Sequence, residues 1–313
     1  MILCLCPNPS IDKFVWFDTF EGGQVNRFTK EQHFPGGKGI HVALAARELG
    51  EEVIVLGFWG GATGRWLKSE CEKYGIVCYG PDTEGWSRTC LTFKSEGKYD
   101  DTEILGCGPF ISTADFRQFL NTFSQLITDA SCVTMSGSWP EGSPSDSYAQ
   151  LIEIATQAGK NTFLDCSGEQ LSNALFKKPY LVHINEKEGQ SLSLGSNSRE
   201  IACLLSASCE FAAVTAGADG LYFATGNEIV HAQCEVSEVY SAVGSGDCLL
   251  AGLTVAFLRN MNLIDAAKFA VACGGANCIR QDLGMLYKSD VEILQKRAFV
   301  KNVNSEISKI KRM

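Results

Sequence analysis

The chain has 313 residues, of which 45% are hydrophobic and 20% are charged, and its formal net charge at pH 7 is −9. This length allows a large buried core, and the acidic balance argues against nucleic acid as the main partner. No apolar run approaches the roughly 20 residues that span a bilayer, and the short apolar N-terminus lacks a basic lead, so we expect neither a membrane span nor a signal peptide. The 14 cysteines form no CxxC pair, which favours reduced thiols in a cytoplasmic protein.

The first expected strand, residues 1–6, runs into two prolines, and Asp12 follows shortly after its carboxyl end. Ligands of open α/β sheets bind at that end of the strands, although a turn-stabilising aspartate explains the position equally well. Residues 13–33 and 76–106 contain short strands without a crossover helix, and we expect the first of these segments to be a hairpin outside the main sheet. Arg88 precedes one of these strands, where it is either a bidentate phosphate ligand or a solvated edge residue.

Three glycines and a lysine, Gly36-Gly37-Lys38-Gly39, open an amphipathic segment that we expect to be helical through Leu49. Free backbone N–H groups at this helix start, together with Lys38, form a candidate anion site. A tight helix-entry turn with a surface lysine is an equally good interpretation. The spacing GxxxxGK[ST] is absent, so the segment is not a Walker A loop.

Beyond residue 109 the pattern becomes a regular alternation of short apolar runs and amphipathic segments. Expected strands cover 132–135, 162–164, 181–184 and 211–215, and expected helices cover 112–129, 146–159, 199–208 and 263–280. Such alternation predicts an α/β fold with a mainly parallel sheet and helices on both faces. Residues 220–224 and 229–236 look antiparallel, and the basic tail 301–313 is expected to be a frayed, solvated helix.

Polar residues follow the carboxyl ends of the expected strands. They are Asp12, Ser136, Asp165, Asn185, Glu188, Gly217 and Asp247. Each of them alone is explained as a turn residue. Their collection on one rim of the sheet favours an enzyme, because ligands of such sheets bind at that rim.

The most informative stretch begins at Ser241. Gly244 and Gly246 flank Ser245, so the backbone can turn sharply and present N–H groups at the start of an apolar helix over residues 249–258. A helix start carries partial positive charge and suits a phosphate. Asp247 at this position is explained by helix capping alone. Beside an anion site it can also take a proton from a hydroxyl that attacks a phosphoryl group.

Taken together, these motifs resemble the ribokinase-like (PfkB-type) carbohydrate kinases, and within them the branch of 1-phosphofructokinase and tagatose-6-phosphate kinase. The resemblance rests on Asn8-Pro9-Ser10-Ile11-Asp12, Gly36-Gly37-Lys38-Gly39, Ser136-Gly137-Ser138, Asn185-x-x-Glu188, Thr215-x-Gly217-x-x-Gly220 and Gly244-Ser245-Gly246-Asp247. It implies a ribokinase-like three-layer sandwich in one domain over residues 1–313. It also implies that segments 13–33 and 86–105 form a β-sheet lid, which in relatives often pairs with its copy in a homodimer.

The implied activity is ATP-dependent phosphorylation of a hexose phosphate, either fructose 1-phosphate or tagatose 6-phosphate. Asp247 would be the general base, and the backbone of Gly244, Ser245 and Gly246 would hold the charge on the transferred phosphoryl group. The implied substrate-side residues are Asp12, Gly36, Gly37, Lys38, His41, Arg88 and Ser136, with Lys38 and Arg88 on the phosphate of the substrate. The implied nucleotide-side residues are Asn185, Thr215, Gly217, Gly220 and Asn277, and Asn185 and Glu188 would place Mg²⁺ largely through waters.

Two positions depart from the family pattern. His41 stands where asparagine is usual, and His183 stands where a lysine usually precedes Pro-Asn. The change at His41 leaves the choice of sugar open. The change at His183 removes a cation near the nucleotide phosphates, which either alters nucleotide handling or is only a local repacking. Two other functions remain as alternatives, namely a kinase of an unphosphorylated sugar or nucleoside, and a sensor that binds sugar phosphate or nucleotide without turnover.

Overall fold

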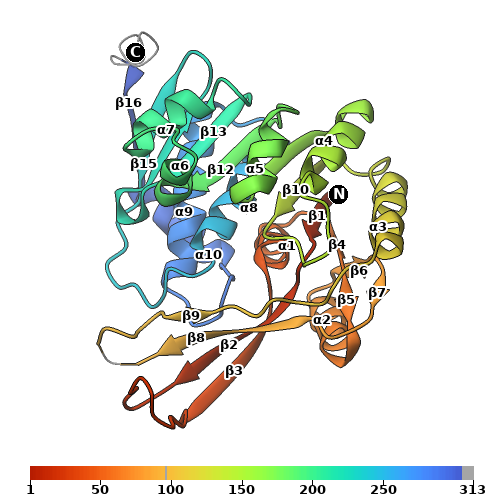
Figure 1. The fold of residues 1–313 in the computed structure, drawn as a ribbon. Helices are drawn as coiled ribbons and strands as arrows, with labels where there is room; N and C mark the ends of the chain where they lie inside the picture. The colour runs from red at the N-terminus through yellow and green to blue at the C-terminus, as the bar shows by residue number, and fades with distance from the viewer. Residues whose placement is uncertain (96, 305–313) are drawn as a thin grey trace.

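The computed structural model describes residues 1–95 and 97–304. A ten-stranded sheet forms its centre, with the strand order β16-β15-β14-β13-β12-β11-β10-β1-β4-β6 (Figure 1). Seven neighbouring strands are parallel: β1 (Ile2–Cys6), β4 (Val53–Gly57), β6 (Val77–Tyr79), β10 (Cys132–Ser136), β11 (Asn161–Asp165), β12 (Leu181–Asn185) and β13 (Phe211–Thr215). The remaining three are antiparallel: β14 (Leu221–Ala224), β15 (Ile229–Gln233) and β16 (Phe299–Asn302).

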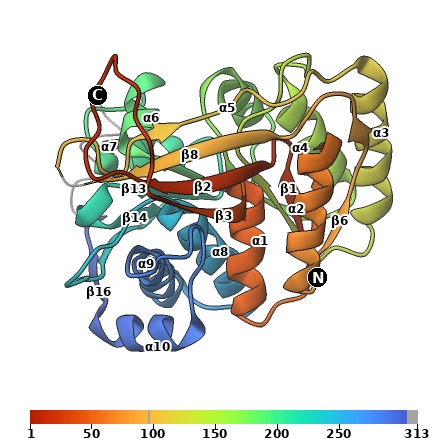
Figure 2. The same cartoon turned by 90° about the horizontal axis from the view of Figure 1, so that it is seen from below.

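Helices cover both faces of this sheet, as the alternating pattern predicts (Figure 2). One face carries α1 (Lys38–Glu48), α2 (Gly61–Lys73), α8 (Ser245–Leu258), α9 (Leu263–Cys278) and α10 (Lys288–Arg297). The other carries α3 (Thr113–Leu126), α4 (Ser147–Gln157), α5 (Gly168–Leu175), α6 (Glu186–Ser191) and α7 (Ser198–Leu205). Strands such as β1 and β10 are buried at every position because apolar layers cover them on both sides. The expected α/β sandwich with a mainly parallel sheet is confirmed.

The helix α8 lies between α1 and α9, and ten consecutive residues from Asp247 to Ala256 are buried. Its sequence is apolar on every side, which is typical of a helix enclosed by others rather than one on the surface. Packing on all sides fixes the N-terminus of α8 relative to β1 and α1. The position of Asp247 therefore depends on the core.

A second sheet, of four strands in the order β3-β2-β8-β9, lies along one end of the molecule (Figure 1). It consists of β2 (Ser10–Trp16), β3 (Lys30–Gly36), β8 (Arg88–Lys94) and β9 (Glu103–Ile104). The strand β2 begins four residues after β1 ends, so this small sheet adjoins the carboxyl ends of the central strands. It contains strands from both segments that the resemblance assigns to a lid, and it starts earlier, at Ser10. A separate pair, β5 (Trp59–Gly60) and β7 (Asp82–Thr83), makes a third, two-stranded sheet.

The far end of the small sheet is attached to the segment that leads into α8. Lys94 Nζ lies 3.0 Å from the carboxylate of Asp101 and 3.0 Å from the carbonyl oxygen of Tyr240. The hydroxyl of Ser241 donates to Asp101 at 3.0 Å. The side chain of Lys94 is only 8% exposed, so these are largely desolvated contacts. The small sheet therefore contacts the chain just before Gly244.

Two sequence-based expectations need correction. Three helices, α5, α6 and α10, were not anticipated. The tail was expected to be a helix from residue 301, but Lys301 and Asn302 belong to β16, which pairs with β15. The edge of β15 offers backbone hydrogen-bond partners to this segment, and the charged residues of the tail alone gave no indication of this pairing. Residues 305–313 of that tail lie outside the described residues.

Within the part of the chain that the structure describes, no helix combines the length and the apolar character that crossing a membrane requires.

Candidate active site

The predicted helix start at the glycine-rich turn is confirmed. Gly244 is the N-cap of α8 with φ of 84°, and a Cβ at this residue would lie 2.7 Å from Cα of Gly284. No side chain caps this helix end. Its first N–H groups lack intrahelical acceptors, so the turn Gly244–Gly246 offers backbone donors and the positive end of a helix dipole to an anion.

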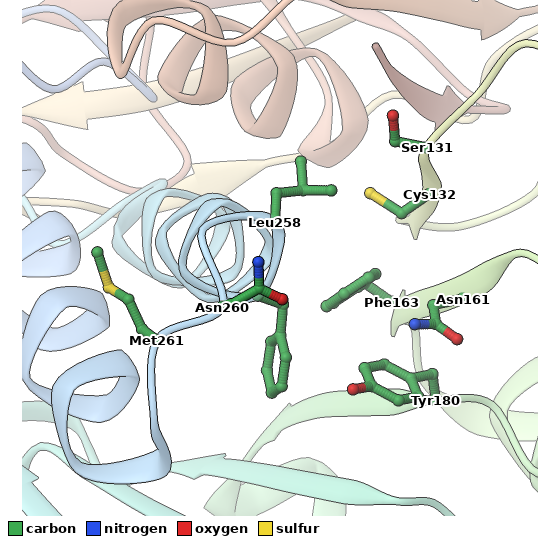
Figure 3. A pocket seen from close by; sticks show the side chains of 9 residues that line it. Ser131, Cys132, Asn161, Phe163, Tyr180, Leu258, Asn260 and Met261 are labelled. Carbon is green, nitrogen blue, oxygen red and sulfur yellow. The ribbon is translucent and has the colours of Figure 1, made fainter.

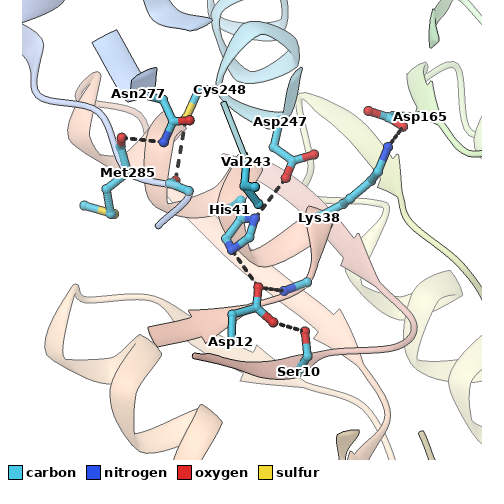
Figure 4. A network of polar contacts seen from close by, with 12 residues as sticks. Ser10, Asp12, Lys38, His41, Asp165, Val243, Asp247, Cys248, Asn277 and Met285 are labelled. Atoms are coloured by element: carbon cyan, nitrogen blue, oxygen red, sulfur yellow. Dashed lines mark hydrogen bonds and ion pairs between the residues drawn. The ribbon is translucent and has the colours of Figure 1, made fainter. Parts of the chain in front are cut away.

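Asp247 is the third residue of α8, and its side chain is 7% exposed. Its Oδ2 lies 2.9 Å from Nδ1 of His41, a residue of α1 (Figure 4). The carboxylate is thus held beside the helix start by a ring from another element. A carboxylate in this place can accept a proton from a hydroxyl while the backbone donors next to it face an incoming phosphoryl group.

Asp12 lies on β2 and meets the same histidine from the other side. Its Oδ2 is 3.2 Å from Nε2 of His41 and accepts a hydrogen bond from the Gly37 backbone at 3.3 Å. Its Oδ1 accepts from the Ser10 hydroxyl at 2.6 Å. A Cβ on Gly36 would stand 2.1 Å from Oδ2, so only glycine leaves room for this carboxylate. Two of the three glycines of the first candidate anion loop, Gly36 and Gly37, therefore contact Asp12.

Lys38, the first residue of α1, points at the carboxyl end of β11. Its ammonium lies 2.5 Å from Oδ1 of Asp165, and Nδ1 of His183 lies 2.8 Å from Oδ2 of the same carboxylate. Burial alone would raise the pKa of Asp165, but Lys38 and His183 outweigh it and lower the pKa. Burial likewise opposes the charge of Lys38, yet Asp165, followed by Asp247 and Glu188, raises its pKa above the usual range. Lys38 is therefore a cation within electrostatic reach of Asp247.

The remaining substrate-side residues differ in how many of their polar groups form hydrogen bonds within the protein. Ser136 ends β10, and its hydroxyl is buried without a hydrogen-bond partner. Arg88 begins β8 and donates from Nε to the carbonyl of Asn8 at 3.1 Å and from Nη1 to that of Gly106 at 3.4 Å. The hydroxyl of Ser136 is available for a ligand, whereas part of the Arg88 guanidinium is used to join β8 to neighbouring loops.

The nucleotide-side residues lie at the ends of β12, β13 and α9. Thr215 ends β13, with its hydroxyl 3.4 Å from Nε2 of His183. Gly217 opens a short 3-10 helix, and nothing lies within 4 Å of where its Cβ would be. At Gly220 a Cβ would lie 2.2 Å from the carbonyl of Ala232, so this glycine is required by packing. Asn277 is buried in α9, and its amide donates to the carbonyl of Met285 at 3.0 Å while its own oxygen has no partner.

The Asn-x-x-Glu motif forms a reciprocal cap on α6. The side chain of Asn185 accepts from the Glu188 N–H at 3.0 Å, and Oε2 of Glu188 accepts from the Asn185 N–H at 2.8 Å. No group of three or more potential ligands occurs among the residues that the structure describes. One carboxylate oxygen of Glu188 is not used by the cap. That donor set fits Mg²⁺ held mostly by its own waters and not a closed protein cage.

Two members of this site, Asp165 and His183, were not assigned a role from the sequence. Asp165 was among the polar residues at the carboxyl ends of the expected strands, and this position was the sequence signal for a site residue. Its partner Lys38 lies 127 residues away, so nothing local pairs them. His183 was noticed only as a departure from the family pattern. The structure packs its ring against the anion turn, since a Cβ on Gly246 would lie 3.1 Å from its Cε1.

A separate hollow of about 350 Å³ lies at the opposite ends of the strands (Figure 3). It is bordered by the starts of β10 and β11 and by the C-terminal end of α8, and no charged side chain lines it. Phe163, Tyr180 and Phe257 form its aromatic wall. The carboxylates and anion donors described above are at the other end of α8, so we do not place the chemistry in this hollow.

The buried ion pairs of His41 generate a prediction about stability and pH. Burial disfavours the charged ring, but the carboxylates of Asp12 and Asp247 outweigh this and raise the pKa of His41 to about 10 from an unfolded value near 6.5. The resulting stabilisation is complete below pH 6.5 and is lost as pH rises toward 10, at roughly 1.4 kcal/mol per unit of pKa difference. The melting temperature of the wild type should therefore exceed that of His41→Asn most at pH 6, with the gap closing toward pH 10. A gap that does not change with pH would contradict a charged His41.

Comparisons with known proteins identify the family of this chain. The model of the pfkB family carbohydrate kinases matches residues 8–285. A protein of Bacillus subtilis (strain 168) named 1-phosphofructokinase is 31% identical over 290 residues, which are 91% of this chain and 94% of that protein.

Solved structures of phosphofructokinase-2 from Escherichia coli share the fold. One, in complex with substrates and products, has a TM-score of 0.88 at 25% identity and covers 94% of this chain and 98% of its own. Another, a tetrameric inhibited form, has a TM-score of 0.86 at 26% identity with the same coverage. The family match spans most of the chain, including the turn before α8 and the strand that carries Asp12. The chain therefore belongs to the pfkB family of carbohydrate kinases.

Proposed function

We propose that the chain is an ATP-dependent kinase of a hexose phosphate, with fructose 1-phosphate or tagatose 6-phosphate as acceptor. The observation that carries the proposal is the carboxylate of Asp247 at the uncapped start of α8, one histidine away from Asp12. A relative at 31% identity is named 1-phosphofructokinase, which supports a phosphorylated hexose as the substrate. The structural neighbour that was solved with fructose-6-phosphate supports the same substrate class.

In the proposed reaction, Asp12 binds hydroxyl groups of the sugar and orients the acceptor hydroxyl toward Asp247. Asp247 takes the proton as the acceptor oxygen bonds to the γ-phosphorus of ATP, and the bond from that phosphorus to the β-phosphate oxygen breaks to release ADP. Backbone N–H groups at Gly244–Gly246 stabilise the charge on the transferred phosphoryl group. Mg²⁺, when bound, neutralises phosphate charge, and Glu188 is the residue that would contact its waters.

The nucleotide would lie along the ends of β12 and β13, beside Asn185, Thr215 and Gly217. Gly217 has open space at its Cβ position, as a residue that borders a ligand requires. Gly220 shapes the turn that follows, and Asn277 supports the loop at Met285. Ser136, whose buried hydroxyl has no protein partner, would face the sugar.

Removing the base should separate chemistry from binding. In Asp247→Asn, the amide cannot accept the proton, so kcat should fall by about 10²- to 10⁴-fold while the KM for ATP stays near the wild-type value. ADP release is measured with each hexose phosphate in a coupled assay, and Asp129→Asn, on the surface after α3, serves as the control. Wild-type kcat in Asp247→Asn would refute the assignment of the base.

Charge on the acceptor distinguishes the leading function from a kinase of an unphosphorylated sugar or nucleoside. That alternative is favoured by one observation, namely that Lys38 and Arg88 both have partners within the protein. If the acceptor carries a phosphate, replacing both residues by glutamine should raise its KM by about 100-fold or more, because charge-assisted hydrogen bonds to the phosphate are lost. Lys13→Gln, which breaks a lysine–carboxylate pair with Glu31 on the same small sheet, is the matched control. An unchanged sugar KM in the double variant would favour the alternative. Ligand binding without ADP release by the wild type would indicate a sensor.

We also propose that the small sheet is a lid and that it pairs with its copy in a homodimer in the cytoplasm. Large apolar side chains on or beside the sheet are exposed, among them Phe28, Trp86, Ile104 and Leu105. The edge strand β9 leaves one side unpaired, which is the usual place for strand addition. The fourteen cysteines are all free thiols, which supports a reducing compartment.

The dimer predicts a particle of twice 34.0 kDa in sedimentation at micromolar concentration. Ile104→Lys should shift the mass to that of a single chain, because the charge would be buried in the interface. Phe176→Lys, at an apolar and still more exposed position after α5, should leave the mass unchanged. A wild type that sediments only as a single chain would exclude the homodimer.

A further inference from the structure

His41 joins three elements that are far apart in the sequence. It projects from α1, its Nδ1 lies 2.9 Å from Oδ2 of Asp247 on α8, and its Nε2 lies 3.2 Å from Oδ2 of Asp12 on β2. Figure 4 shows the ring between the two carboxylates. In a proposed kinase, one of these carboxylates binds the sugar and the other removes its proton. The position therefore connects two separate tasks of the active site.

The three side chains are almost completely shielded from water. The exposed fractions are 5% for His41, 11% for Asp12 and 7% for Asp247. Two carboxylates in such a place repel each other strongly unless a cation lies between them. Within the described residues, His41 is the basic side chain that forms ion pairs with these two carboxylates. The nearby lysines are paired elsewhere, Lys38 with Asp165 and Lys94 with residues of its own hairpin. The raised pKa of His41 agrees with a charged ring at neutral pH.

Other charges near the ring come from the lid. Glu103 lies on β9, and burial raises the pKa of its carboxyl group. Asp12 and Asp247 raise this pKa further, whereas His41 lowers it. The ring also has a fixed backing, since a Cβ on Gly284 would stand 2.2 Å from Cδ2 of His41. The loop that contains Gly284 therefore keeps the ring from turning away from the two carboxylates.

The two ring nitrogens are used differently. Nδ1 is within a hydrogen bond of Asp247. Nε2 is buried and, although it is 3.2 Å from Asp12, it has no hydrogen-bond partner there because the alignment is poor. A buried donor without an acceptor is unfavourable, and a ligand oxygen that accepts from it regains that free energy.

We propose that His41 is a positioning residue that couples sugar binding at Asp12 to the orientation of the base Asp247. This rests on the proposed kinase function. Nδ1–H holds Asp247 by Oδ2, which leaves Oδ1 for the acceptor hydroxyl. Nε2–H is left for a sugar oxygen that binds beside Asp12. When the sugar occupies this position, its oxygen fixes the ring of His41, and the ring in turn holds Asp247.

This coupling has a consequence for specificity. A sugar that lacks the oxygen beside Asp12 leaves Nε2 unpaired and the ring less firmly held, so it should lose turnover as well as affinity. A site in which Asp12 and Asp247 acted independently would lose affinity only, because the interaction would be made equally in the ground state and the transition state.

The bridge itself is tested by NMR of the full-length protein labelled with ¹⁵N-histidine at pH 7, which does not depend on turnover. Wild-type protein should show a low-field N–H proton that disappears in His41→Asn. The resonance should shift in Asp12→Asn and in Asp247→Asn, since each variant neutralises one partner of the ring. His33→Asn, which removes an exposed histidine paired with Glu31, should leave it in place. Absence of the resonance, or its indifference to both aspartate substitutions, would overturn the bridge.

Kinetics tests the coupling. His41→Asn keeps a donor but cannot reach both carboxylates or carry charge, so kcat should fall by up to about 100-fold, as expected for a misplaced catalytic group. The KM for ATP should stay near that of the wild type and of His33→Asn. A rise in the sugar KM with wild-type kcat would reduce His41 to a simple ligand and overturn the proposal. If the wild type phosphorylates no sugar phosphate, the proposed function fails, and the NMR experiment still decides whether the bridge exists.

Discussion

Two buried carboxylates share one imidazole at the point where the small sheet, α1 and the start of α8 meet. Burying Asp12 and Asp247 without a counter-charge would be strongly unfavourable, and in this chain a cation lies between them. The ring of His41 supplies that charge and leaves no room for a Cβ on Gly284, while the Asp12 carboxylate leaves none for a Cβ on Gly36. The glycines around the site are therefore explained by the volume that this charged cluster occupies.

The same principle applies along the rim of the sheet. Asp165 has no exposed surface and is neutralised by Lys38 on one side and His183 on the other. His41 and His183 thus both contact a carboxylate. In each case the imidazole packs against a glycine, Gly284 for His41 and Gly246 for His183. The two histidines are therefore alike in their physical surroundings.

Local patterns were sufficient to predict much of this fold. Alternating apolar runs predicted the parallel sheet, and the glycines around Ser245 predicted the start of α8. Contacts between distant residues were not predictable from one sequence. His41 and Asp247 are 206 residues apart, and the pairing of β16 depends on a free edge that exists only after β15 has folded. The gathering of polar strand ends was predictable, whereas the identity of their partners was not.

The small sheet contacts the start of α8 at two separate places. At its base, Asp12 reaches Asp247 through His41, and at its far end Lys94 and Asp101 hold Tyr240 and Ser241. The ring of Phe14, on β2, packs against Tyr240 between these contacts, with centroids 6.1 Å apart. The glycine turn that would receive the phosphoryl group begins three residues after Ser241. A displacement of the small sheet would therefore act on this turn from both ends, because Ser241 precedes the turn and Asp247 follows it.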